Sequence, residues 1–363
     1  MNKKWRVAVL GLGHWYSAFN LARALPEYPR AELVGVWWHH PMQLSAFASR
    51  FGVRAHEDYR ELLARGDIDV VHLAAPVSEL PELTIAAAQA GKHIILGKPM
   101  AMTLAQADRM VEAVERAGVQ CMPFQAMTRL RISDLKARID AGEIGDVAVL
   151  HQTCRWSIAE DWMSSGRPGW FADPAHVPGG AFIDEGIYWI DAFRWLAGSD
   201  IVQAEGKVAN LVHKDIAVED WGFGTFTFAN GVVATLEAAW TINSPRKTGP
   251  SPKHNAVVRL EIVGTRGEII DQWFRSPGRA VLAAGANDWV FERQPEDRFT
   301  ATSPLVLDHL IDCLEDRAKP IATIRDARAS FAAAMSVYES AKRVGAGAAQ
   351  IAGADDRAAS TSL

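Results

Sequence analysis

The feature that most constrains this chain is a regular alternation of short apolar runs and segments of helical periodicity between Trp5 and Phe124. The helical segments at 17–25, 43–51, 83–90 and 103–117 separate five predicted strands. These strands span 5–10, 32–37, 70–74, 93–96 and 119–124. Strands that alternate with helices predict βαβ units and a parallel sheet covered on both faces. We therefore expect an α/β domain over residues 1–125.

After residue 126 the pattern changes to strands in series. Helices are predicted at 131–140 and 181–196, and strands at 147–156, 201–210, 222–228, 232–241, 256–263 and 268–271. Asn230-Gly231 indicates a tight hairpin, because both residues tolerate positive φ. This order predicts an α+β domain with a largely antiparallel open sheet over 126–344, ending in helices at 305–316 and 326–344. The Ala-, Gly- and Ser-rich residues 345–363 are predicted to form a flexible tail.

Composition excludes several classes of protein. The chain has 363 residues, with 38 Lys and Arg against 43 Asp and Glu, so no basic surplus favours nucleic acid or an anionic membrane surface. No apolar run approaches the roughly 20 residues of a membrane span. Cys121, Cys154 and Cys313 lie far apart, which predicts buried, reduced thiols in a cytoplasmic protein, with no disulfide framework and no metal site.

Two glycines at the end of the first predicted strand indicate dinucleotide binding. Gly11 and Gly13 precede a predicted helix, where a sharp turn lets the backbone approach a pyrophosphate. The third glycine of the G-x-G-x-x-G pattern is replaced by Tyr16, and an ordinary strand–helix turn can carry the other two. The motif alone is therefore weak evidence for a Rossmann domain.

The end of the second strand lacks the acidic residue that holds the adenine ribose of NAD. Trp38 stands in its place, followed by His39 and His40. Without that acid the sequence favours NADP slightly over NAD, with Trp38 stacked on adenine and a histidine near the 2′-phosphate. The alternative is that all three are ordinary surface residues.

Two groups of polar residues could carry chemistry. Lys98 follows the predicted strand 93–96, at the strand end where ligands of open α/β sheets bind. Asp184, Tyr188 and Asp191 share one face of an otherwise apolar helix, since they are spaced i, i+4 and i+7. A random surface lysine and a structural hydrogen-bond network are the alternatives, and the network is favoured for Asp191.

Aromatic and basic residues are concentrated between 155 and 170, just before that helix. Arg155, Trp162, Arg167 and Trp170 are suited to stack on sugar faces and bind hydroxyls or a carboxylate. Some of these tryptophans could instead simply fill a core.

The order of these motifs resembles the Gfo/Idh/MocA oxidoreductase family, which includes glucose–fructose oxidoreductase, inositol dehydrogenase and dihydrodiol dehydrogenase. The resemblance covers nearly the whole chain. It rests on the G-x-G turn, Ala75-Pro76, Gly91-Lys92-His93, Lys98-Pro99 and a Gly-Gly-x-x-x-Asp-x-Gly-x-Tyr-x-x-Asp segment that runs from Gly179 to Asp191.

The resemblance implies an NAD(P)-dependent oxidoreductase that transfers hydride between nicotinamide and a carbon of a sugar, polyol or related cyclic alcohol. Lys98 would lie near the nicotinamide and the substrate oxygen, before a cis bond to Pro99. Tyr188 would give or take the proton, and Asp184 would orient the substrate and Lys98. The implied cofactor-binding residues are Gly11, Gly13, His14, Trp15, Trp38, His39, Ala75, Pro76, Lys98 and Gln125, and the implied substrate-binding residues are Lys98, Arg155, Trp162, Arg167, Trp170, Asp184 and Tyr188.

Four departures from the family pattern lie in the cofactor half: Tyr16, Trp38, Leu80 for a common histidine, and Gly97 for the glutamate before the lysine. Two other functions therefore stay open. One is an eliminase or glycoside-cleaving enzyme that uses transient oxidation by a bound nucleotide, and the other is a nucleotide-dependent sugar-sensing protein. The family is commonly oligomeric, which implies a homodimer or homotetramer formed through the second sheet.

Overall fold

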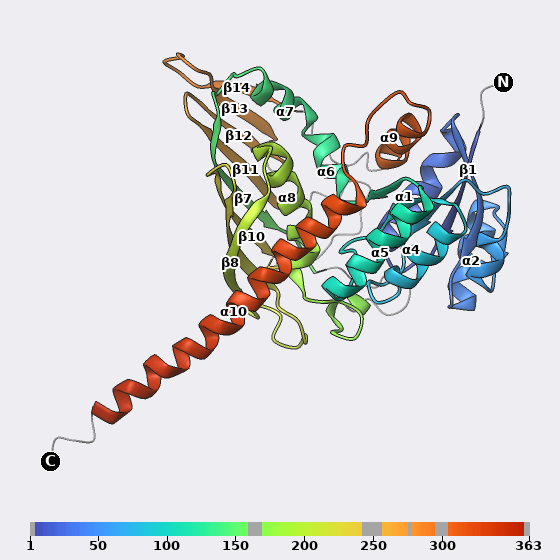
Figure 1. Ribbon diagram of the computed structural model, residues 1–363, viewed down its shortest axis with the longest axis horizontal. Helices are drawn as coiled ribbons and strands as arrows, with labels where there is room; N and C mark the ends of the chain where they lie inside the picture. Colours follow the sequence, from blue (N-terminus) through green and yellow to red (C-terminus); the bar gives the residue numbers. More distant parts are fainter. Residues whose placement is uncertain (1–3, 159–168, 242–255, 275–276, 295–303, 359–363) are drawn as a thin grey trace.

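Two sheets make up the protein, one with helices on both faces and one with helices packed on a single face (Figure 1). A computed structural model describes residues 4–158, 169–241, 256–274, 277–294 and 304–358. All strands of the first sheet precede residue 124, and all strands of the second follow residue 146. Over the described ranges no helix is long and apolar enough to cross a membrane.

The first sheet is wholly parallel, as predicted. Its order is β3 (Ala55–His56), β2 (Ala31–Trp37), β1 (Trp5–Leu10), β4 (Val70–Leu73), β5 (His93–Leu96) and β6 (Cys121–Pro123). The crossover helices are α1 (Trp15–Ala24), α2 (Pro41–Phe51), α3 (Tyr59–Leu63), α4 (Leu80–Gln89) and α5 (Leu104–Ala117). Every residue of β4 is buried, because both faces of a parallel sheet lie under helices. This arrangement brings the carboxyl ends of β1, β4 and β5 together at one edge.

Local signals determine where these helices begin and end. Thr103 and Gln106 form a complete capping box before α5, and Gly118 ends that helix in the left-handed conformation. The sequence does not reveal the short elements β3 and α3, which have too few residues to show a period.

The second sheet has eight strands in the order β14-β13-β12-β11-β7-β10-β9-β8. Neighbouring strands are antiparallel except β7 and β10, which are parallel. Of the two turn residues at Asn230-Gly231, Gly231 takes the positive φ. The strands are β7 (Val147–Arg155), β8 (Ile201–Ala209), β9 (Trp221–Phe228), β10 (Val233–Ala239), β11 (Val257–Gly264), β12 (Glu268–Gln272), β13 (Gly278–Leu282) and β14 (Val290–Arg293); the sequence did not predict the last two.

Helix α8 (Ala181–Ala197) packs against β7, β9 and β10 on one face of this sheet, and none of the described helices covers the other face, which we call the open face. The long helix α10 (Ile324–Ala358) contacts α5, α8 and β8, so it bridges the two halves (Figure 1). Residues 345–358, predicted as part of a flexible tail, continue α10, and their flexibility stays a prediction. Short helices α6 (Ala126–Arg131) and α7 (Ser133–Asp140) lead from the first sheet to the second, and two 3-10 turns lie at η1 (Leu25–Glu27) and η2 (Gly169–Ala172).

Helix α9 (Leu305–Leu314) returns to the first half, although its sequence lies after the second sheet (Figure 1). Arg30, just before β2, binds Asp308 at 2.6 Å and Asp312 at 2.8 Å. The Trp5 indole donates to Glu315 at 2.9 Å. The predicted range 126–344 for the second domain therefore includes a helix that packs on the first.

Candidate active site

The glycine turn after β1 is held close to the end of β4. Gly11 has a φ of +94°, and a Cβ there would lie 2.6 Å from the Cα of Ala75. A Cβ on Gly13 would lie 2.9 Å from the Pro76 ring. Both positions thus require glycine, and α1 begins directly after the turn, as a dinucleotide site needs.

Lys98 follows β5 at the same sheet edge, and the Lys98–Pro99 peptide bond is cis, as the family resemblance implied. Its side chain is only 2% exposed and points at α8, where its ammonium group forms an ion pair with the Asp184 carboxylate. The same nitrogen donates to the Asp184 carbonyl oxygen at 2.8 Å.

The start of α8 explains the paired glycines before Asp184. A Cβ on Gly180 would lie 2.0 Å from the Glu219 carbonyl oxygen, and one on Gly179 would lie 2.2 Å from the Tyr338 hydroxyl. The partly buried Glu219 carboxylate accepts hydrogen bonds from the Gly180 and Phe182 amides and from Tyr338. These bonds satisfy amides at the helix N-terminus and fix the turn that carries Asp184.

Tyr188 lies one turn further along α8, and the Lys98 nitrogen is 5.0 Å from the centre of its ring. Burial opposes the charge of Lys98, yet Asp184, Tyr188 and Glu185 together raise the pKa of Lys98 above its usual value. Burial also raises the pKa of Tyr188, while Lys98 and a hydrogen bond with Tyr16 act in the opposite direction. The net direction is upward, so Tyr188 keeps its proton at neutral pH.

Tyr16, the residue in the third-glycine position, reaches this group from α1. Its hydroxyl lies 3.1 Å from Nδ1 of His14, and its interaction with the Tyr188 hydroxyl favours a lower pKa for Tyr188. Sequence reasoning counted Tyr16 only as a defect of the glycine motif, because no local pattern reveals a contact between residues so far apart in the chain.

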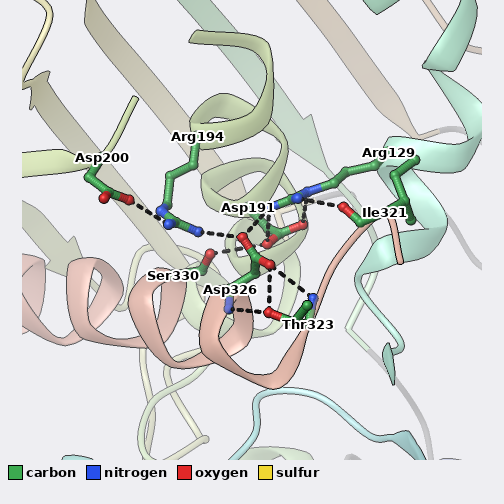
Figure 2. A network of polar contacts seen from close by, with 8 residues as sticks. All are labelled: Arg129, Asp191, Arg194, Asp200, Ile321, Thr323, Asp326 and Ser330. Carbon is green, nitrogen blue, oxygen red and sulfur yellow. Dashed lines mark hydrogen bonds and ion pairs between the residues drawn. The ribbon is translucent and has the colours of Figure 1, made fainter. Parts of the chain in front are cut away.

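Asp191, on the same helix face, belongs to a separate network (Figure 2). Arg129 binds its two carboxylate oxygens at 2.7 and 2.8 Å, and Ser330 adds a hydrogen bond at 3.3 Å. Asp326 forms ion pairs with Arg129 at 3.2 Å and with Arg194 at 3.1 Å, so it links the two arginines. The structural network favoured for Asp191 by the sequence is confirmed.

The other side chains predicted to contact substrate are not all brought to Lys98. Trp170 lies at the glycine turn, with its ring 4.9 Å from that of His14 and stacked on Phe171. Arg155 lies on the face of the second sheet opposite α8, where it binds Glu237 at 2.6 Å. Trp162 and Arg167 fall outside the described residues.

A carboxylate that the sequence did not predict lies beside the end of β2, on the residue before α4. Trp38 is buried and donates to Gln43 at 2.7 Å, whereas His39 Nδ1 lies 3.8 Å from a carboxylate oxygen of Glu79. Burial and the nearby Glu82 raise the pKa of Glu79 to about 7. Burial and the charges of His40 and His176 lower the pKa of His39.

Two of the family departures contact each other. A Cβ on Gly97 would lie 2.8 Å from the Leu73 carbonyl oxygen and 3.2 Å from Cδ1 of Leu80. Leu80 therefore fills part of the space that a side chain at position 97 would need, so the two replacements lie next to each other.

The residues at the sheet edge fit a dinucleotide. Besides the glycine turn, His14 and Gln125 are 2% and 1% exposed, and each leaves a buried ring or amide nitrogen without a partner among the described residues. Buried polar atoms without partners are rare in native proteins and point to a missing ligand. Gly11, Gly13, His14, Lys98 and Gln125 are the residues that would hold the cofactor.

Family models match both halves of the chain. Residues 5–125 match the oxidoreductase family model with an NAD-binding Rossmann fold, and residues 132–270 match the GFO/IDH/MocA C-terminal domain. The chain belongs to the Gfo/Idh/MocA family. It is an oxidoreductase with an NAD-binding Rossmann domain, and the resemblance read from its motifs is confirmed.

The relatives of this chain include sugar and polyol dehydrogenases. The chain is 29% identical to scyllo-inositol 2-dehydrogenase (NAD(+)) of Bacillus subtilis over 90% of its own length and 91% of that protein. It is 27% identical to myo-inositol 2-dehydrogenase of Thermotoga maritima, over 73% and 74% of the two chains. The solved complex of levoglucosan dehydrogenase with NADH and levoglucosan has the same fold, with a TM-score of 0.79 and 23% identity over 94% of this chain and 98% of that one.

Proposed function

We propose that the protein is a dehydrogenase of a sugar, polyol or related cyclic alcohol, with Lys98, Asp184 and Tyr188 as its catalytic residues. The observation that carries the proposal is the buried Lys98–Asp184 ion pair beside Tyr188, next to the glycine turn. The names of the relatives support this class of substrate.

Lys98 binds the reacting oxygen, Asp184 holds Lys98 in place, and Tyr188 transfers the proton. When bound, a nicotinamide cofactor accepts or supplies the hydride. The Lys98 ammonium, held in place by Asp184, binds the oxygen of the reacting carbon and favours negative charge on it. The protonated Tyr188 hydroxyl gives its proton to that oxygen in reduction, and after deprotonation it takes the hydroxyl proton in oxidation.

The test is a set of polyols and sugars assayed with NAD and NADP. We expect scyllo-inositol, myo-inositol, levoglucosan or a D-glucoside, deuterated at the reacting carbon, to yield deuterated reduced nucleotide. An eliminase would release product without net nucleotide reduction, and a sensor would bind sugar without either change. Either result would overturn the dehydrogenase proposal.

We propose NAD rather than the NADP that the sequence slightly favours, because Glu79 supplies a carboxylate beside His39 at the end of β2. With its pKa raised to about 7 by burial, Glu79 ionises as the pH rises past neutrality and repels a 2′-phosphate. Titrations of NADH and NADPH, followed by tryptophan quenching, should show a preference for NADH that grows between pH 6 and 8. Glu79→Gln should remove this pH dependence, and an unchanged dependence would refute the assignment.

We also propose that the open face of the second sheet joins subunits into a homodimer or homotetramer. Outward-facing residues of β7, β9 and β10 are partly exposed on this face, among them Val233 at 42%. Sedimentation should give an oligomer, and Val233→Arg should weaken it. A monomer at micromolar concentration would contradict the proposal.

A further inference from the structure

Tyr16 connects the glycine turn to the predicted acid–base group, and neither the family pattern nor the catalytic set uses it. It lies on α1, two residues after His14, and its hydroxyl meets the hydroxyl of Tyr188 on α8. The Nδ1 atom of His14 lies 3.1 Å from the same Tyr16 oxygen. The His14 ring and the two tyrosine hydroxyls therefore form one polar cluster beside the glycine turn.

We propose that Tyr16 is a positioning residue for Tyr188: its hydroxyl donates a hydrogen bond to the Tyr188 oxygen, and His14 holds Tyr16 in that position. The inference rests on the proposed role of Tyr188 in proton transfer. It gives a role to the tyrosine that replaces the third glycine.

The protonation states determine the direction of these hydrogen bonds. Burial, together with Tyr188, Asp184 and Glu185, raises the pKa of Tyr16 well above its usual value, so Tyr16 keeps its proton. Once Tyr188 has lost its own proton, Tyr16 is the donor between the two oxygens. Burial and the charge of Lys98 hold the pKa of His14 well below its usual value. Neutral His14 with its proton on Nδ1 then donates to the Tyr16 oxygen.

Four groups thus act on the Tyr188 oxygen. Asp184 and Glu185 disfavour its deprotonated form, while the Lys98 charge and the Tyr16 hydrogen bond favour it. A hydrogen bond to a charged oxygen is stronger than one between neutral groups. Removal of the Tyr16 hydroxyl should therefore raise the pKa of Tyr188 further and leave its ring in place.

The experiment compares pH profiles of alcohol oxidation for the wild type, Tyr16→Phe and Tyr28→Phe, with myo-inositol or the polyol of the set that is turned over fastest. Tyr28 bonds Asp308 on α9, remote from Lys98, so Tyr28→Phe is a matched loss of one phenol hydroxyl. We expect the alkaline rise in kcat to move up by about 1–2 pH units in Tyr16→Phe. The profile of Tyr28→Phe should stay unchanged.

A second measurement does not depend on turnover. The chain has five tyrosines, and the difference in phenolate absorbance between the wild type and Tyr188→Phe isolates the titration of Tyr188. The same difference, taken between Tyr16→Phe and the double variant Tyr16→Phe/Tyr188→Phe, should show that the pKa of Tyr188 is higher when the Tyr16 hydroxyl is absent. His14→Asn, which keeps a donor near Nδ1, should move it less than His14→Leu, and these variants replace Tyr16→Phe if it does not fold.

An unchanged Tyr188 titration in Tyr16→Phe, with only a raised KM for nucleotide, would overturn the inference and leave Tyr16 as a part of the cofactor turn. Full activity of Tyr188→Phe would instead refute the proposed function itself. The two failures are therefore distinguishable.

Discussion

Asp184 and Asp191 lie two turns apart on one face of α8, and both are buried against a cation from another segment. Asp191 lies in a closed network, because Arg129 and Ser330 bind its oxygens and Arg129 is itself held by Asp326. Asp184 shares Lys98 with Tyr188, whose side chain is only partly buried. Burial and ion pairing occur at both carboxylates, so neither property identifies a catalytic group. What distinguishes Asp184 is the partly buried Tyr188 phenol beside its ion pair with Lys98.

The largest effect on turnover is expected from removing Lys98, the cation paired with Asp184. Lys98→Met should lower kcat by about 10³-fold, because the substrate oxygen loses its positive partner and Tyr188 its neighbouring charge. Steady-state kinetics measures this loss, and thermal unfolding shows the cost of leaving Asp184 unpaired. The double variant Lys98→Met/Asp184→Asn should recover stability without activity. Near-normal turnover in Lys98→Met would show that the Lys98–Asp184 pair is structural, like the Arg129–Asp191 pair.

Tyr188→Phe should lower kcat by about 10²-fold or more while nucleotide binding stays within a few-fold, since only the proton-transfer group is lost. In the wild type, the upward shift of the Tyr188 pKa predicts that reduction persists at neutral pH and declines above the raised pKa. Oxidation, which needs the deprotonated phenol, should rise with pH over the same range. Opposite slopes in the two directions, absent in Tyr188→Phe, are the expected result.

Asp191→Asn should have the smallest effect on turnover. Breaking this buried pair should destabilise the fold by about 3 kcal/mol, because the Arg129 charge loses its main partner. Denaturant unfolding measures the loss, and kcat per folded molecule at low temperature should stay within twofold. A large drop in kcat with unchanged stability would place Asp191 in the catalytic group.

The elements that the sequence predicted well are those with local causes. Strands β1 and β5 begin and end where their apolar runs do, and the capping box of α5 follows from two side chains three residues apart. The position of Arg155 could also have been predicted from a local pattern, the alternation of side chains along β7. Strand alternation places it on the same face as His151 and opposite the buried Cys154, hence away from α8.

Contacts between distant segments could not be predicted in this way. Tyr16 comes near Tyr188 because α8 of the second half packs over the edge of the first sheet, and Glu79 comes near His39 because the ends of β2 and β4 lie at the same sheet edge. No spacing within one segment encodes such proximity. The replaced ribose acid at Trp38 was visible in the sequence, whereas the carboxylate of Glu79 beside His39 was not.

The contact between Gly97 and Leu80 also restricts how this site can change. A glutamate at position 97 would place its Cβ 2.8 Å from the Leu73 carbonyl oxygen and 3.2 Å from Cδ1 of Leu80. The Leu73 oxygen belongs to the main chain, so replacing Leu80 alone would not remove it from the space beside position 97. Glycine at position 97 is therefore required by the path of the β4 main chain as well as by Leu80, and an engineered side chain at this position would need the end of β4 to move.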